Sequence, residues 1–231
     1  MLTALLAIIV GFNIWGATTQ GSLEPSANAT RNGAANQVVM VLGATGSSGS
    51  GLLKAALDDK DVKKIYVVTR RITPYIETTV ATGKVTVIMQ KDFTDYSAIS
   101  DELSEVSTVL WGLGTSSLQV DEATYTLIHV DFPAAFLTAW LTARKEVGEI
   151  NSAMAFHFIA GMGTESSDAP WAHDKRKTEQ DMATMAEGTG LRTFSYRSAY
   201  IRPISELIST PHYITEALLR PGSLVTTSKE L

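Results

Sequence analysis

The sequence predicts an α/β fold in which a parallel sheet is covered by helices on both faces. The first observation is an apolar run at residues 38–42 that leads into a glycine-rich turn and then an amphipathic segment, the order strand, turn, helix. The second is that strand and helix patterns go on alternating along the chain. The third is size: 231 residues with 45% hydrophobic composition suit one core, so we expect a single domain.

Further segments continue this alternation after the first strand. Strand patterns occur at residues 64–69, 84–89, 106–111, 156–160 and 192–196, and helical patterns are clearest at 125–145 and 175–187. This order predicts a doubly wound parallel sheet, the Rossmann fold, which binds ligands at the carboxyl ends of its strands. Pro133 is expected to kink the longer helix because proline lacks a backbone N–H. A small extension at 204–231 is expected on the substrate side, as a pair of helices over the ligand or as a cap on the core.

The turn after the first strand contains glycines at positions 43, 46 and 49. In dinucleotide-binding proteins the first such glycine allows the turn, the second lets backbone approach the pyrophosphate, and the third lets helix and strand pack closely. We assign these roles to Gly43, Gly46 and Gly49. Thr45 and Ser48 are included among the candidate cofactor-binding residues. The first interval is one residue longer than usual, and an ordinary glycine-rich turn is the alternative interpretation.

The end of the second predicted strand bears on the choice of cofactor. It reads Thr69-Arg70-Arg71, with no carboxylate nearby. A protein that uses NAD usually places Asp or Glu here to accept from the ribose 2′-hydroxyl, whereas the 2′-phosphate of NADP calls for arginine. The sequence therefore favours NADP over NAD, and a solvated basic strand end is the alternative.

Two further stretches are expected beside the cofactor. Asp92 and Phe93 follow the third strand and would place a carboxylate and an apolar side chain near the adenine. Gly112 and Gly114 follow the fourth strand and would bring backbone close to the cofactor. Either stretch also fits plain loop chemistry.

Composition excludes several classes of function. The chain has no cysteine, which excludes disulfides, thiolate metal sites and a cysteine nucleophile. Its net charge of −5 gives no electrostatic basis for binding nucleic acid. No metal site is expected.

The first 35 residues differ from the rest, and we expect the nucleotide-binding domain to span 36–231. Residues 2–15 are almost wholly apolar and a polar stretch follows them. The run is short for a spanning helix, which needs about 20 apolar residues, and it lacks the basic flank of a signal peptide. One interpretation is a signal-like or anchoring leader, with membrane contact through residues 2–17 and a membrane or secretory location. The other is an unstructured leader ahead of a cytoplasmic domain.

Several motifs occur in a fixed order along the chain. They are the glycine turn, the Thr69-Arg70-Arg71 strand end, and residues 92–96, 112–116, 161–166, 171–179 and 202–203. In this order they resemble the atypical short-chain dehydrogenase/reductases of the NAD(P)-binding type, near the Tat-interacting oxidoreductase-like branch. The resemblance covers roughly residues 38–203 and implies a Rossmann fold with bound NADP(H).

The resemblance also implies a catalytic serine, tyrosine and lysine, which this sequence carries only in part. In that family the tyrosine exchanges a proton with the substrate oxygen, the lysine four residues later lowers its pKa and holds the ribose, and the serine orients the carbonyl. Lys175 matches the lysine and is the candidate catalytic residue, counted also as cofactor-binding. Trp171 stands at the tyrosine position, and Ala160 or Gly161 at the serine position. An indole N–H donates a hydrogen bond but is no acid near neutral pH.

Two other residues of this region carry transferable protons. His173 lies two residues after Trp171, which points it to a different side of a helix, and a lone histidine is more often structural or solvated. Tyr200 follows the sixth strand, where a core or rim aromatic is the plainer interpretation. Neither is assigned a catalytic role.

Two functions from different classes remain. The first is an NADP(H)-dependent oxidoreductase that acts on an unknown carbonyl, alkene or quinone with a degenerate Ser/Tyr pair. The second is a catalytically inactive NADP(H)-binding regulatory or scaffold protein, in which the cofactor stabilises a surface for a protein partner.

Overall fold

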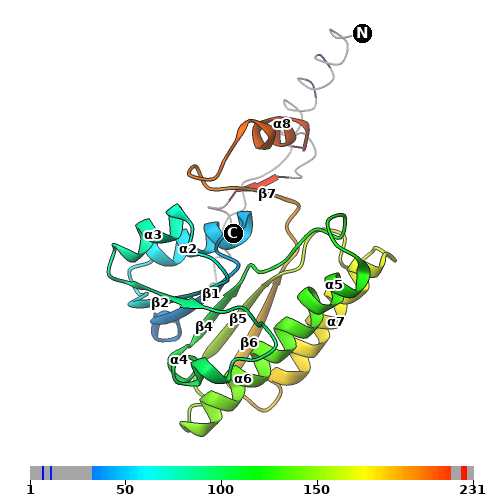
Figure 1. The fold of residues 1–231 in the computed structure, drawn as a ribbon. Coiled ribbons are helices and arrows are strands. Elements are labelled where there is room, and N and C mark those ends of the chain that lie inside the picture. Colours follow the sequence, from blue (N-terminus) through cyan, green and yellow to red (C-terminus); the bar gives the residue numbers. More distant parts are fainter. Residues whose placement is uncertain (1–6, 8–10, 12–32, 220–224, 228–231) are drawn as a thin grey trace.

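The computed structural model describes Ala7, Gly11, residues 33–219 and residues 225–227 of the chain (Figure 1). The predicted leader therefore lies almost entirely outside the described residues, and its interpretation stays a prediction.

A six-stranded parallel sheet forms the centre of the molecule (Figure 1). Its strands lie in the spatial order β3-β2-β1-β4-β5-β6. Their bounds are β1 (Val38–Leu42), β2 (Lys64–Thr69), β3 (Val85–Met89), β4 (Thr108–Trp111), β5 (Met154–Ile159) and β6 (Leu191–Tyr196). The strand order reverses between β1 and β4, and such a switch point is where open α/β sheets bind ligands. The predicted fold class, a doubly wound parallel sheet, is confirmed.

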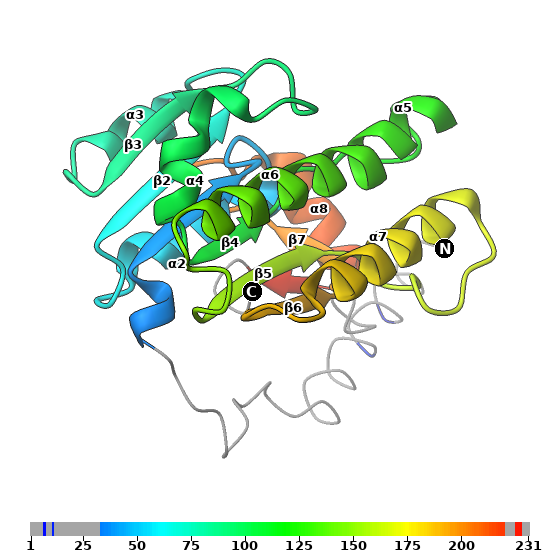
Figure 2. The same cartoon turned by 90° about the horizontal axis from the view of Figure 1, so that it is seen from below.

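Helices cover both faces of this sheet (Figures 1 and 2). One face carries α2 (Ser47–Asp58) and α3 (Pro74–Val80). The other carries α4 (Ser100–Glu105), α6 (Phe132–Glu146) and α7 (Pro170–Ala186), of which α6 and α7 lie side by side. Shorter helical segments are η1 (Gly33–Asn36), η2 (Ser97–Ile99), α5 (Glu122–Thr126) and η3 (Leu127–Asp131).

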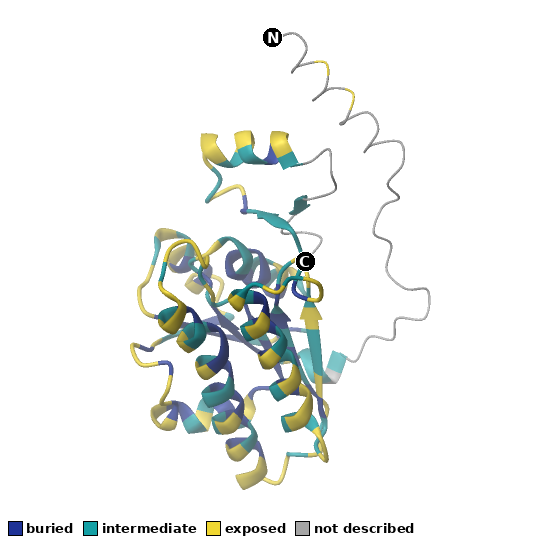
Figure 3. Ribbon diagram, turned by 90° about the vertical axis from the view of Figure 1, so that its right-hand side faces the viewer, coloured by how far each residue is buried: buried dark blue, intermediate teal, exposed yellow. Residues whose placement is uncertain are grey.

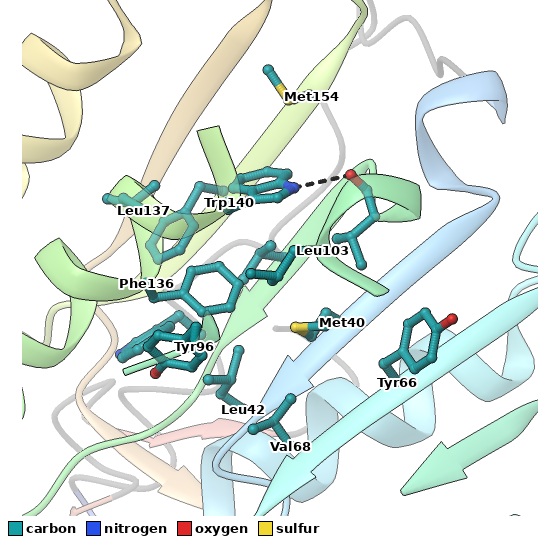
Figure 4. Close-up of a cluster of buried hydrophobic side chains, with 14 of the residues drawn as sticks. Met40, Leu42, Tyr66, Val68, Tyr96, Leu103, Phe136, Leu137, Trp140 and Met154 are labelled. Carbon is teal, nitrogen blue, oxygen red and sulfur yellow. Dashed lines mark hydrogen bonds between the residues drawn. The ribbon is translucent and has the colours of Figure 1, made fainter. Parts of the chain in front are cut away.

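The larger part of the core lies between the sheet and α4, α6 and α7 (Figure 4). Met40 and Leu42 of β1 face this core, while Val39 and Val41 face the smaller core under α2 and α3. A strand buried on both faces reads as a continuous apolar run, which explains the first segment of the sequence pattern. Trp140 of α6 is fully buried, and its indole Nε1 donates to the Val106 carbonyl oxygen at 3.0 Å. Burying a large apolar side chain of this kind contributes about 2 to 3 kcal/mol.

The long helix predicted at 125–145 is a composite run, Glu122–Glu146. It joins α5, the π-helical turn η3 and α6, and Pro133 lies in the first turn of α6. Among the described residues it is the run long and apolar enough to cross a membrane by length and composition. Phe136 and Trp140 of this run pack into the core, as expected of a core helix. The π turn matters for the site because it sets the direction of His129.

The C-terminal extension differs from the predicted helix pair. It contains β7 (Tyr200–Arg202), the single helix α8 (Thr210–Leu219) and β8 (Val225–Thr227), and β7 and β8 pair in parallel. Ile204 is buried but lies in a turn, not in a helix. The extension stands beyond the carboxyl ends of the sheet strands, and much of the outer surface of α8 is exposed (Figures 1 and 3). Arg202 Nε lies 3.3 Å from Glu216 Oε2, which ties α8 to β7.

Candidate functional site

The glycine turn after β1 is built by backbone packed against backbone. Gly43 has φ +82°, a conformation that favours glycine, and a Cβ there would lie 2.4 Å from the Gly112 carbonyl carbon. A Cβ on Gly49 would lie 2.1 Å from the Gly43 oxygen, and a Cβ on Gly112 2.7 Å from the Gly49 Cα. These three positions therefore exclude every side chain. The close packing of β1, α2 and the end of β4 depends on them.

Gly46 plays a different part in the same turn. It is the N-cap of α2 in an extended conformation, and its N–H donates to the Gly43 oxygen at 2.9 Å. A Cβ on Gly46 would meet nothing closer than 3.5 Å, so packing within the protein does not require glycine here. No side chain caps the first turn of α2, and no acidic residue lies in it. The positive end of the helix is thus left for an external anion.

A cavity of about 540 Å³ lies over this turn, and we call it the nucleotide-side cavity. The described residues that line it are Gly43, Thr45, Gly46, Val68, Thr69, Arg70, Arg71, Phe93, Gly112, Leu113, Gly114, Thr115, Val120, Ile128 and Phe132. It brings together eight predicted cofactor-binding residues from four separate stretches. Ser48, Gly49, Asp92 and Lys175 are predicted residues that do not line it.

The two arginines at the end of β2 line this cavity with exposed side chains. The Thr69 hydroxyl donates to the Arg71 carbonyl oxygen at 2.9 Å and also accepts from the Arg71 N–H at 3.3 Å, which fixes the turn that carries them. No carboxylate occurs among the described lining residues. An anion at this wall would meet cationic side chains, as the sequence predicts for a 2′-phosphate.

Asp92 and Phe93 diverge in the structure. The Phe93 side chain is buried, lines the cavity and lies 5.5 Å from the Phe132 ring, centroid to centroid. The Asp92 carboxylate instead accepts from the Thr94 N–H at 2.8 Å and from its hydroxyl at 2.6 Å. These hydrogen bonds hold the pKa of Asp92 below its usual range. Its carboxylate therefore closes a local turn and does not reach the cavity.

His129 fixes the loop after β4. Its ring is buried, with Nε2 lying 3.2 Å from the Thr115 nitrogen and 3.0 Å from the Thr115 oxygen. A Cβ on Gly114 would lie 2.8 Å from His129 Cε1, so this glycine is required for the histidine to approach. The ring stacks on Tyr125 with centroids 4.1 Å apart. Burial, with the nearby charge of Lys175, lowers the pKa of His129 to about 3 and keeps the imidazole neutral.

A second cavity of about 500 Å³ adjoins the first, and we call it the substrate-side cavity. The described residues that line it are Thr115, Ser116, Ser117, Tyr125, Gly161, Met162, Trp171, Ser198, Ala199, Tyr200 and Leu219. Thr115 lines both cavities, so they meet at the loop that His129 holds. Trp171 faces this cavity because α7 begins at Pro170 and not near position 175 as the sequence pattern predicts.

Lys175 is not among the described residues that line either cavity. Its side chain is buried, its Nζ donates to the Ile159 carbonyl oxygen at 2.9 Å, and it lies 4.6 Å from the Phe158 ring centroid. Burial lowers the pKa of Lys175 to about 7, an effect that the Glu179 carboxylate opposes. The ammonium has further N–H donors beyond the one on Ile159.

The loop after β5 forms another wall of the substrate-side cavity and is held from α7. Gly161 in this loop has φ +103°. The Arg176 guanidinium donates to the carbonyl oxygens of Thr164 and Ser167, the latter at 2.8 Å. His173 is exposed and lies on this outer side, with Nδ1 3.2 Å from Arg176 Nη2. It faces away from the cavity that Trp171 lines.

Three residues of the site carry no strong signal in the sequence. Tyr125 and His129 lie four residues apart, which places them on one face of a helix, and this spacing is the only clue to their contact. Ser198 follows β6 and reaches the substrate-side cavity only because β6 turns into β7 there.

Comparisons with known proteins support the same fold. No family model matches the chain. Leucinostatins biosynthesis cluster protein T from Purpureocillium lilacinum is 26% identical over 145 residues, 62% of this chain and 50% of that protein. The chain thus spans half the length of this curated relative.

Three solved structures illustrate the likeness in fold. A 3-oxoacyl-[acyl-carrier protein] reductase from Brucella melitensis matches with TM-score 0.62 and 14% identity over 83% of this chain and 85% of that chain. An actinorhodin polyketide ketoreductase variant with NADPH matches with TM-score 0.60 and 14% identity, covering 84% and 86%. UDP-glucuronic acid 4-epimerase from Bacillus cereus, in complex with UDP-glucuronic acid and NAD, matches with TM-score 0.57 and 14% identity, covering 71% and 57%. The chain shares the Rossmann fold of these reductases and epimerases.

Proposed function

We propose that this chain is an NADP(H)-dependent oxidoreductase of the atypical short-chain dehydrogenase/reductase type. The observation that carries the proposal is the nucleotide-side cavity. It combines a glycine turn that excludes side chains, an uncapped helix N-terminus and two arginines at one wall. The similar structures that bind NADPH or NAD support the same assignment.

The residues present fit a nicotinamide dinucleotide. Gly46 and the first turn of α2 would hold the pyrophosphate, because backbone N–H groups and the helix dipole favour an anion there. Arg70 and Arg71 would hold the 2′-phosphate, with Phe93 beside the adenine. Thr115 marks the passage to the substrate-side cavity. When bound, the nicotinamide would supply or accept a hydride, which is the chemistry of an oxidoreductase.

Lys175 is proposed as the residue that would hold the nicotinamide ribose. Its buried ammonium is anchored on Ile159 and keeps other donors free for a ribose hydroxyl. Trp171 offers an indole N–H toward the substrate-side cavity but no transferable proton near neutral pH. Ala160 is buried and offers no hydroxyl. The proposed enzyme therefore works without the usual Ser/Tyr pair.

A second candidate function is favoured by that missing pair. A catalytically inactive NADP(H)-binding regulatory or scaffold protein would keep the nucleotide-side cavity and lose the catalytic serine and tyrosine. Cofactor binding would then stabilise the fold by mass action for a partner protein. Consumption of NADPH in the presence of a carbonyl or quinone panel separates the two functions.

The test of cofactor binding compares NADPH with NADH by thermal shift and by calorimetry on the full chain. We expect NADPH to raise the melting temperature more than NADH at equal concentration, since only NADPH carries the phosphate that faces the arginines. Equal shifts would remove the preference for NADP. No shift with either nucleotide would remove the proposed function altogether.

The domain boundary and the leader stay proposals. We infer a nucleotide-binding domain over residues 36–231, preceded either by a leader with a membrane contact through residues 2–17 or by an unstructured leader ahead of a cytoplasmic domain. Fractionation of cells that express the chain with and without residues 1–35 tests this, because a leader with a targeting role would change the fraction in which the protein is found.

A further inference from the structure

The substrate-side cavity differs in chemistry from the nucleotide-side cavity beside it. Its described lining contains no carboxylate, no ammonium, no guanidinium and no imidazole. The polar side chains among its lining residues are neutral: the hydroxyls of the Thr115–Ser117 loop, of the tyrosines and of Ser198, and the indole N–H of Trp171. A carboxylate or phosphate in a ligand would find no cation among these residues, and burying an unpaired charge is costly. The cavity therefore suits an uncharged ligand.

Flat aromatic side chains form its walls from three separate elements. Tyr125 comes from α5, Trp171 from α7 and Tyr200 from β7. The Tyr125 ring is held against the His129 ring and is buried. Rigid aromatic walls favour flat, conjugated ligands, because such rings stack with offset faces and lose little freedom on contact.

Hydrogen-bond donors in this cavity lack partners in the protein. Within the described residues, the hydroxyl oxygens of Ser198 and Tyr200 are buried without a hydrogen-bond partner. Buried polar groups in folded proteins are nearly always paired, so such orphans indicate a missing ligand or water. Two hydroxyl donors with aromatic walls match a flat compound that carries carbonyl oxygens.

The reaction chemistry narrows this class further. Hydride transfer to a simple ketone leaves an alkoxide, whose conjugate acid has a pKa near that of water and far above neutral pH, so a nearby acid is needed. Hydride transfer to a quinone leaves the anion of a hydroquinone, a phenolate whose conjugate acid has a pKa of about 10. The hydroxyl donors of the cavity can stabilise that anion by hydrogen bonds until it takes a proton from water. In balance, one quinone, one NADPH and one proton give one hydroquinone and one NADP⁺.

We propose that the substrate-side cavity binds a neutral, flat, conjugated carbonyl compound of the quinone class. This inference rests on the proposed oxidoreductase function and names its substrate class. A quinone matches the cavity because it is uncharged and flat, like the space between the aromatic walls. Its reduction also does not need a side-chain acid at position 171. The chain also has no cysteine, so no thiolate of its own would be alkylated by a quinone.

The binding test uses three bicyclic probes on the full chain with NADP⁺ present: menadione, 2-naphthoate and 1-tetralone. Menadione is expected to bind at least tenfold more tightly than the anionic 2-naphthoate by calorimetry. In a separate assay with NADPH in place of NADP⁺, menadione should be reduced at least tenfold faster than 1-tetralone, a ketone that yields an alkoxide. Equal or tighter binding of 2-naphthoate, or equal reduction of 1-tetralone, would overturn the inference.

A charge placed in the cavity tests its location. Ser117 lines the cavity and its side chain is exposed, so Ser117→Lys is compatible with folding. The new ammonium should tighten 2-naphthoate binding on the order of fivefold, the upper range for a partly exposed ion pair. Thr138→Lys, at an exposed position of α6 away from both cavities, should leave the binding of every probe unchanged. If the ratio of the menadione affinity to the 2-naphthoate affinity is the same in Ser117→Lys as in the wild type, the probes bind elsewhere and the inference is overturned.

Trp171→Ala adds a readout independent of turnover. Menadione binding should weaken about tenfold, and the share of tryptophan fluorescence quenching that comes from Trp171 should disappear, while NADPH binding by calorimetry is retained. If wild-type protein binds NADPH but not menadione, the substrate class fails and the proposed function stands. If NADPH itself does not bind, the proposed function fails first.

Discussion

The two adjoining cavities are built by different means. The nucleotide-side cavity is shaped mainly by backbone: glycines 43, 49 and 112 exclude one another's side chains, and the first turn of α2 is left uncapped. The substrate-side cavity is shaped by side chains from loops, from α5 and α7 and from the C-terminal extension. The difference teaches that the first has little freedom to change, because one methyl group would disrupt it, whereas the second can change chemistry through single substitutions such as Trp171.

The largest expected effect tests the backbone-built cavity. Gly49→Ala would place a Cβ 2.1 Å from the Gly43 oxygen, so we expect it to lower the free energy of unfolding by about 3 kcal/mol or more, measured by urea denaturation. Gly46→Ala is the matched control in the same turn, since its Cβ meets nothing closer than 3.5 Å. It should cost less than about 1 kcal/mol and should weaken NADPH binding. If both variants lost similar stability, Gly49 and Gly46 would not differ as proposed, with the first needed for packing and the second facing the ligand.

The next effect concerns the junction of the cavities at His129. Burial lowers its pKa to about 3 from the ordinary 6.5, so the folded state binds fewer protons than the unfolded state between these values. The stability that the neutral His129 contributes is therefore present above pH 6.5 and is lost as the pH falls from 6.5 toward 3. Between pH 6.5 and 5 we expect a loss of about 2 kcal/mol from this residue, measured by urea denaturation.

His129→Gln should lower the slope of stability against pH by this contribution, whatever its effect on stability at pH 7. His157 is a second contributor, because burial lowers its pKa to about 4. A slope in His129→Gln equal to that of the wild type would mean that its imidazole is not held neutral as the structure indicates.

The smallest expected effect tests the charged wall that sets the cavities apart. Arg71→Asp should weaken NADPH binding about tenfold relative to NADH, because a charge-assisted bond to the 2′-phosphate is replaced by repulsion. Lys91→Asp makes the same change at an exposed residue that does not line the cavity and should leave the ratio near that of wild type. An unaltered ratio of the two affinities in Arg71→Asp would take this arginine out of the cofactor site.

Much of the fold follows from local sequence patterns. The strand at 64–69 agrees with the structure at both ends, and the other predicted strands differ by at most two residues at either end. The helix ends were less predictable: α7 begins five residues earlier than its pattern, at Pro170. The C-terminal helix pair is wrong, since the described residues of this region form a single helix and a two-stranded sheet.

The residues of the candidate site also divide into those that the sequence could predict and those that it could not. The glycines and arginines that line the nucleotide-side cavity could be selected from the sequence because strand ends and helix starts fix where they lie. The role of Asp92 could not be predicted in this way. A local turn decides whether its carboxylate faces a ligand or accepts from Thr94. Lys175 could be selected through the family resemblance, but its burial against Ile159 depends on how α7 packs on the sheet.

The sequence by itself determined the parallel sheet, the glycine turn and the basic strand end, because backbone periodicity and glycine stereochemistry act over a few neighbouring residues. Only the tertiary structure decided which side chains meet across the switch point. The contact of His129 with Gly114 and Thr115, the uncharged lining around Trp171 and the neutral imidazole at the junction all join residues far apart in the chain. Their proximity and burial are set by packing, which no short pattern encodes.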